Sequence, residues 1–363
     1  MRTGRFKKKF MNFALLLLAI LCAVVAIEMF ARIFIRSWAP TSTEQVEFWH
    51  YDSLLGWSHQ PLQTGRFTNP YFSVSVSISA QGLRDKAYPF ERVEGKRRLL
   101  VLGDSFGWGF GVEQSEIFSE VLERNHPEWE IINASVSGYG TDQEFLYLKE
   151  RGFQFKPDVV LVLFFENDFY DNNEQVLYWY PKPIFQLGPN FSGLAPTRLS
   201  VPTNEQLILQ NVPVPPATWY QYLSRYIAGK TYFIARLHWL RNWMYARGKS
   251  LLGGKSQNHA KLPCGSSDDE KRFRVTFRLF SSMNRFVNDR GARLVIVSVP
   301  MRTECTKLLG DYFQREAIPY LPLDSAFAGQ QRTTTSDGFH WNAAGHTAAA
   351  RAIESFLEER KFF

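Results

Sequence analysis

Unbroken runs of apolar residues constrain the fold of this chain more than any other feature. The clearest are 99–102 (LLVL), 159–165 (VVLVLFF) and 294–297 (LVIV). A strand that is apolar at every position is buried on both faces, as in the centre of a parallel sheet. Segments with helical periodicity separate these runs, and strands joined by helices form parallel sheets with right-handed crossovers. The sequence therefore predicts an α/β fold with a central parallel sheet.

The predicted main domain covers residues 96–363. Its elements are strand 97–104, helix 115–125, strand 130–137, helix 141–152, strand 156–168, helix 268–291, strand 292–300, helix 305–317, strand 318–324 and helix 342–361. Residues 172–265, rich in proline and aromatic side chains, interrupt this alternation and are predicted to be an insertion. Within it, 219–248 is predicted to be helical, either as a cap on the domain or as a basic, aromatic helix on a membrane surface.

Residues 36–95 precede the main domain and are predicted to be a small β-rich segment. Apolar residues alternate with serines from Phe72 to Ile78, which is the period of a strand with one buried face.

The N-terminus has the charge and hydropathy pattern of a membrane segment. A basic tail, residues 1–9, is followed by a predicted transmembrane anchor at 10–35. The excess of positive charge before this segment predicts a single-pass protein of the cytoplasmic (inner) membrane. Its N-terminus would lie inside and its body outside, in the periplasm. A cleavable signal peptide has the same basic and apolar parts and is the alternative.

The formal net charge of +7 is concentrated in the tail, because residues 1–9 contain five basic residues and no acidic one. The body is close to neutral, so we expect no nucleic-acid partner. Cys264 and Cys305 could form a disulfide in an oxidising compartment or remain two thiols, and their spacing does not decide between these states. No cysteine and histidine cluster has metal-ligand spacing, and Asp168 and Asp171 lack a surrounding ligand set, so we expect neither metal nor cofactor.

Polar residues follow the predicted strands where ligands bind in open parallel sheets, at the carboxyl ends. They are Ser105, Gly138, Asn167 and, after the last strand, Asp337 and His340. A serine hydroxyl becomes a good nucleophile when a base removes its proton, and a histidine can act as that base when a carboxylate orients it. The spacing of three residues allows Asp337 to orient His340. The main-chain N–H groups of Ser105 and Gly138 and the side-chain amide of Asn167 could then stabilise an oxyanion.

These residues resemble the motifs of the SGNH/GDSL hydrolase family. The matching blocks are Gly103-Asp104-Ser105, the NASVSG turn that ends at Gly138, Asn167-Asp168, and Asp337 with His340. The resemblance covers roughly 96–172 and 266–360. It implies a flavodoxin-like, three-layer fold with Ser105 as nucleophile, His340 as base and Asp337 as its partner. It also implies ester chemistry without a metal.

One position departs from the family pattern, because Phe165 stands where the third block has glycine. Gly103, Ser105 and Gly107 also form a GxSxG pattern, which is typical of the nucleophile elbow of α/β-hydrolases. That alternative fits less well, because the serine follows the first strand of the sheet and the acid lies three residues from the histidine.

The resulting hypothesis is a membrane-anchored serine esterase that forms an acyl-serine intermediate. It would remove small acyl groups from envelope carbohydrate, or transfer them as an O-acetyltransferase, with a membrane acyltransferase as a candidate partner. The alternative is a non-catalytic envelope module that binds a glycan or a partner protein.

Overall fold

The structure is a computed structural model. The residues that it describes are 2–34, 48–68, 71–177, 180–186, 197–198, 264, 270–330 and 332–362. Most of the predicted insertion, including 219–248, lies outside the described residues.

The N-terminal helix α1 (Arg2–Phe34) contains the predicted membrane segment. Its section Met11–Phe30 is long and apolar enough to cross a membrane, by length and composition, and a signal sequence would have the same character. All the other elements described below belong to a second compact unit, residues 47–215 and 256–363.

Five parallel strands form the central sheet of this unit. They are β5 (Arg97–Gly103), β6 (Trp129–Asn133), β7 (Val159–Phe164), β12 (Arg293–Ser298) and β13 (Tyr320–Pro322). Their spatial order is β13-β12-β7-β5-β6. Numbered along the chain this is 2-1-3-4-5, the flavodoxin-like doubly wound order, so the predicted fold is confirmed.

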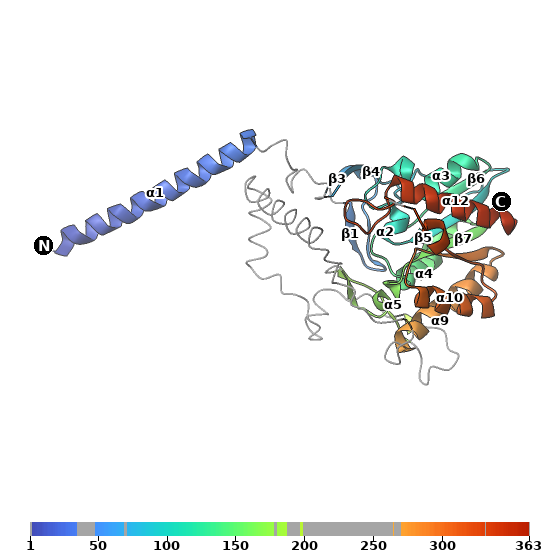
Figure 1. Ribbon diagram of the computed structural model, residues 1–363. Helices are drawn as coiled ribbons and strands as arrows, with labels where there is room; N and C mark the ends of the chain where they lie inside the picture. The colour runs from blue at the N-terminus through green and yellow to red at the C-terminus, as the bar shows by residue number, and fades with distance from the viewer. Residues whose placement is uncertain are drawn as a thin grey trace. The chain divides into compact units, whose positions relative to one another are not determined.

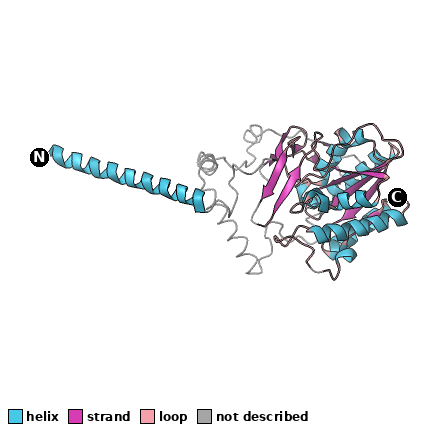
Figure 2. Ribbon diagram, turned by 90° about the horizontal axis from the view of Figure 1, so that it is seen from above, coloured by secondary structure: helices cyan, strands magenta, loops and turns pink. Residues whose placement is uncertain are grey.

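Helices cover both faces of the sheet (Figures 1 and 2). On one face lie α3 (Phe118–Asn125) and α12 (Ala343–Glu359); on the other lie α4 (Thr141–Glu150), α9 (Glu270–Asn288) and α10 (Thr303–Arg315). Leu99 and Val101 of β5 face the first layer, and Leu100 and Leu102 face the second. Fully burying such a side chain stabilises the fold by roughly 1.5–3 kcal/mol. The unbroken apolar runs are therefore explained by helices on both sides.

The strands end earlier than the sequence predicts. The predicted strand 130–137 ends at Asn133, whose side chain makes hydrogen bonds to nearby main-chain groups. Its amide nitrogen donates to the Gly107 carbonyl (2.9 Å) and its oxygen accepts from the Ser135 amide (3.1 Å). These bonds begin the loop that carries Gly138, which stays alongside β5 because the Ala134 and Val136 amides donate to the carbonyls of Val101 (2.8 Å) and Gly103 (3.0 Å).

Two antiparallel hairpins precede the sheet and pack within the same unit. They are β1 (Trp49–Asp52) with β2 (Gly56–His59), and β3 (Thr64–Thr68) with β4 (Ser73–Ser77). In β4, buried valines alternate with exposed serines, as the sequence predicts. The remaining short elements are α2 (Ser105–Trp108), η1 (Gln114–Glu116), η2 (Gly152–Phe155), α5 (Asp168–Asp171), β8 (Val176–Leu177), β9 (Tyr180–Pro181), β10 (Phe185–Gln186), β11 (Thr197–Arg198) and α11 (Asp324–Phe327).

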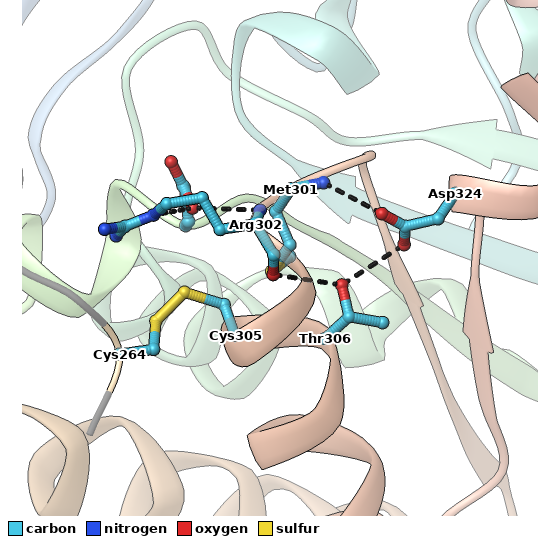
Figure 3. The surroundings of a disulfide bond; sticks show 7 residues. Cys264, Met301, Arg302, Cys305, Thr306 and Asp324 are labelled. Carbon is cyan, nitrogen blue, oxygen red and sulfur yellow. Dashed lines mark hydrogen bonds and ion pairs between the residues drawn. A yellow bond between two sulfur atoms is a disulfide. The ribbon is translucent and has the colours of Figure 1, made fainter. Parts of the chain in front are cut away.

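A disulfide joins Cys264 to Cys305 in the first turns of α10 (Figure 3). The two Cα atoms are 5.1 Å apart and 41 residues separate them in the chain. The alternative that the sequence left open, two unpaired thiols, is therefore not what the structure contains. The bridge ties Cys264, near the end of the predicted insertion, to the start of α10.

Candidate active site

The residues that the sequence predicts for the site follow three adjacent strands of the sheet. Ser105 follows β5, Gly138 lies in the loop after β6, and Asn167 follows β7. Because β5 pairs with β6 on one side and with β7 on the other, Ser105 lies between the other two. The boundary of β5 and β7 is also where the strand order reverses, which is where ligands bind in doubly wound sheets.

Ser105, His340 and Asp337 form a continuous hydrogen-bonded chain. His340 Nε2 lies 2.9 Å from Ser105 Oγ, and His340 Nδ1 lies 2.7 Å from Asp337 Oδ2. Nδ1 donates to the carboxylate, so Nε2 is the nitrogen that can accept the serine proton. The fold thus brings together two segments that lie 235 residues apart in sequence.

Local hydrogen bonds hold Asp337 in place. Burial raises the pKa of its carboxyl, but hydrogen bonds from His340 and Thr335 outweigh this effect and bring the pKa below its usual value. Thr335 Oγ1 donates to Asp337 Oδ1 (2.6 Å), as does the Phe339 amide (2.8 Å). Both carboxylate oxygens therefore have partners, and the side chain stays ionised beside the imidazole.

The short helix α2 places the nucleophile, because Ser105 is its first residue. Asp104 caps this helix by accepting a hydrogen bond from the Phe106 amide (2.9 Å). Burial raises the pKa of Asp104 to about 6. At the other end of α2, Arg84 is buried and donates to the carbonyls of Trp108 (3.0 Å), Gly109 (2.6 Å) and Val112 (2.6 Å).

Two main-chain N–H groups at the site have no hydrogen-bond acceptor within the described residues. They belong to Ser105 and Gly138. Gly138 has φ +83°, a left-handed conformation that favours glycine. Gly138 is buried, and buried N–H groups are nearly always paired, so its N–H and that of Ser105 are candidate oxyanion donors.

The third predicted donor, Asn167, is oriented by α5. Its Nδ2 donates to Asp171 Oδ2 (2.7 Å), which leaves the second N–H of the same amide for another acceptor. Burial raises the pKa of Asp171 to about 7, although Lys182 and the bond from Asn167 oppose the rise.

Buried carboxyls lie behind the site, and the sequence analysis did not identify them as a group. The pKa of Glu144 is raised well above its usual value by burial and by the charges of Asp104 and Asp142, and neither of its oxygens has a hydrogen-bond partner in the described part of the chain. The pKa of Asp168 is also raised well above its usual value, by burial and by the charge of Glu144. Lys182 pairs with Asp142 at 2.6 Å, both fully buried. No short sequence motif reveals this cluster, because tertiary packing assembles it.

Phe165, which replaces the glycine of the family pattern, is part of a triangle of aromatic rings. Its ring centre lies 5.1 Å from that of Phe106 and 5.4 Å from that of Phe339, and these two are 5.4 Å apart. Phe106 and Phe339 also contact the His340 ring, at 5.3 and 4.8 Å, and Phe110 lies against it at 4.4 Å. The imidazole is therefore enclosed by apolar rings.

A potential metal-ligating group within the described residues lies apart from these side chains. It consists of His126, Glu354 and Glu358, where His126 Nε2 and Glu354 Oε1 are 2.9 Å apart. His346 is buried in the core. Its Nδ1 accepts from the Phe118 amide (3.3 Å), and burial lowers its pKa to about 3.

Comparison with known proteins gives matches among solved structures. No protein-family model and no curated protein matches the chain. TesA aligns with 13% identity over 72% of this chain and 99% of its own, with a TM-score of 0.38. The lipase/acylhydrolase from Enterococcus faecalis aligns with 12% identity over 73% of this chain and 96% of its own (TM-score 0.39). A two-domain esterase active on acetylated mannans aligns with 12% identity over 74% of this chain and 51% of its own, with a TM-score of 0.35. By its own strand order, the chain has the flavodoxin-like doubly wound fold that the resemblance to the SGNH/GDSL hydrolases implies.

Proposed function

We propose that the chain is a serine esterase that acts through an acyl-serine intermediate. The observation that carries this proposal is the hydrogen-bonded chain from Asp337 through His340 to Ser105, with distances of 2.7 and 2.9 Å. The N–H groups of Ser105 and Gly138, which have no acceptor among the described residues, support it as the proposed oxyanion donors.

The reaction follows from this geometry. His340 Nε2 takes the proton of Ser105 Oγ as the oxygen attacks the ester carbonyl, and the carbonyl oxygen becomes an oxyanion that the N–H donors stabilise. The carbon–oxygen bond to the alcohol then breaks, and the alcohol leaves with the proton from His340. Water, activated by the same histidine, attacks the acyl group, and Ser105 recovers its proton as the acid leaves. A second alcohol in place of water would give acyl transfer.

Small acyl groups, such as acetyl, are the proposed substrates. The triangle of Phe106, Phe165 and Phe339 occupies space beside His340 that a glycine at position 165 would leave open. We propose carbohydrate of the cell envelope as the alcohol part, because the N-terminal segment would hold the enzyme at a membrane.

The test is hydrolysis of a short-chain aryl acetate by the chain and by Ser105→Ala. We expect Ser105→Ala to lower kcat by at least 10³-fold, because the residual rate then depends on the remaining site. Ser119→Ala is the control, since it makes the same change at a buried serine of α3 whose hydroxyl has no hydrogen-bond partner among the described residues. Equal rates for the three proteins, or no activity on several acyl esters, would refute the esterase proposal.

The proposed location is outside the cytoplasmic membrane, with α1 as the anchor. The basic tail supports this orientation, and so does the Cys264–Cys305 disulfide, because disulfides persist in oxidising compartments. A reporter that is active in the periplasm, fused after the last residue, should be active. Activity of a cytoplasmic reporter at that position would contradict this orientation.

A further inference from the structure

The indole of Trp57 in β2 donates a hydrogen bond to the Ser137 carbonyl. The distance from Nε1 to the oxygen is 3.1 Å, and Trp57 is 3% exposed. Ser137 precedes Gly138, so the acceptor belongs to the peptide group that contains the Gly138 N–H. In a trans peptide the C=O and the N–H point in opposite directions. A donor that holds the carbonyl therefore fixes the direction of the N–H on the opposite side.

Further contacts between the β1–β2 hairpin and the residues after β6 stabilise this orientation. Tyr139 Oη donates to the carbonyl of Trp57 itself (2.5 Å), and the rings of these two residues pack edge to face at 5.6 Å. Gln143 Nε2 donates to the Leu55 carbonyl (2.7 Å), in the turn between β1 and β2. The hairpin and the loop after β6 are thus joined by hydrogen bonds that run in both directions.

Glycine at position 138 makes such support necessary. A residue with φ +83° and no side chain has no packing of its own to fix the adjacent peptide group. Oxyanion donors work because they are oriented before the reaction begins. A peptide group that could rotate would lose that advantage.

We propose that Trp57 is a positioning residue of the oxyanion hole: its indole N–H holds the 137–138 peptide so that the Gly138 N–H faces the reacting carbonyl. This inference rests on the proposed esterase function. It assigns a role in the chemistry to the β-rich segment, although the triad lies entirely outside that segment. Trp57 acts on Gly138 and is not expected to touch the substrate.

The test is Trp57→Phe, which keeps an aromatic ring against Tyr139 and removes the donor. The oxyanion is fully developed only in the transition state, so we expect kcat to fall about tenfold while KM stays within twofold. Tenfold corresponds to about 1.4 kcal/mol, which is within the usual net contribution of a hydrogen bond. Every acyl ester forms the same oxyanion, so the fall in kcat should be similar for acetates of different alcohols.

Trp49→Phe is the matched control, because the Trp49 indole N–H is buried without a hydrogen-bond partner in the described residues. Both variants lose an indole, and denaturation midpoints will show how much stability each loses. An unchanged kcat in Trp57→Phe, a rise in KM alone, or an equal loss of kcat in Trp49→Phe would overturn the inference. The proposed function fails separately, if the unmodified chain shows no hydrolysis that depends on Ser105.

Discussion

Gly107 lies in α2, two residues after the nucleophile, where the structure leaves no room for a side chain. A Cβ added at Gly107 would lie 2.3 Å from Ser135 Oγ and 2.8 Å from Ser135 Cβ. Ordinary van der Waals contact begins near 3.4 Å, so in Gly107→Ala the Ser135 hydroxyl must rotate aside and the two segments must still move apart by about 0.6 Å to relieve the Cβ contact. Overpacking of this kind costs roughly 1–3 kcal/mol, and the helix preference of alanine over glycine offsets about 0.5–1 kcal/mol.

We therefore expect Gly107→Ala to lower the free energy of unfolding by about 1–2 kcal/mol. The effect on activity should be larger, because Ser135 belongs to the loop that carries Gly138, and a displacement of about 1 Å can reduce turnover about 100-fold. Urea denaturation and the kcat for an aryl acetate measure the two effects. Gly310→Ala in α10 is the control, since its Cβ would meet Tyr320 at 3.9 Å and fit without strain.

The second substitution Ser135→Gly removes both atoms that the new methyl group would meet. The Ser135 hydroxyl has no hydrogen-bond partner among the described residues, so its loss alone should have little effect. We expect the double variant to recover most of the activity and stability, with a coupling free energy of at least about 1 kcal/mol. Strictly additive effects, or a Gly107→Ala variant as active as the unmodified chain, would refute the reasoning.

Three further predictions concern the aromatic triangle beside His340, the buried carboxyls and the disulfide. Phe165→Gly should raise kcat/KM for octanoyl aryl esters relative to acetyl aryl esters, because it removes one ring of the triangle beside His340. An unchanged ratio of the two kcat/KM values would count against the proposed preference for small acyl groups. The folded-state pKa of Asp171, about 7, lies above the usual value of 3.8, so ionisation opposes folding and stability falls as pH rises from about 4 to 7. Asp171→Asn should therefore be stabilising at pH 8, by up to roughly 4 kcal/mol, and much less so at pH 5; equal differences in urea midpoint at both pH values would contradict this. Reduction of Cys264–Cys305, which closes a loop of 41 residues, should lower stability by up to about 4 kcal/mol, and an unchanged Tm with reductant would exclude this contribution.

The parallel sheet and the candidate triad residues could be predicted because each has a local sequence pattern, whereas the flavodoxin-like fold came only from the family resemblance. Runs such as Val159–Phe164 are apolar on both faces, and Asp337 and His340 are separated by three residues. Strand ends were predicted less well, because they depend on tertiary hydrogen bonds such as the one from Asn133 to Gly107. The disulfide could not be predicted for the same reason, since sequence separation says nothing about the distance between two Cα atoms.

The residues that surround and position the site were not identified from the sequence, for a different reason. Glu144 lies on an ordinary helical pattern, and its burial against other carboxyls appears only when α4 is packed on the sheet. Trp57 lies in a hairpin that the sequence separates from the motif residues by some 50 positions, yet it bonds to the loop before Gly138.

The hydrogen bonds of Arg84, which join the β-rich segment to the nucleophile helix, have a consequence for sequence variation. All the acceptors of its guanidinium hydrogen bonds are main-chain carbonyls, those of Ser75, Trp108, Gly109 and Val112. Every amino acid supplies the same carbonyl, so mutations at Ser75 and Val112 can preserve their contacts without any compensating change at Arg84. Trp108 and Gly109 are more restricted, because the Trp108 ring lies 4.4 Å from the guanidinium and Gly109 has φ +83°. Covariation would therefore fail to detect the part of this link that runs from Arg84 to Val112. A chain shortened to begin at Lys96 would keep all the motif residues and lose this support.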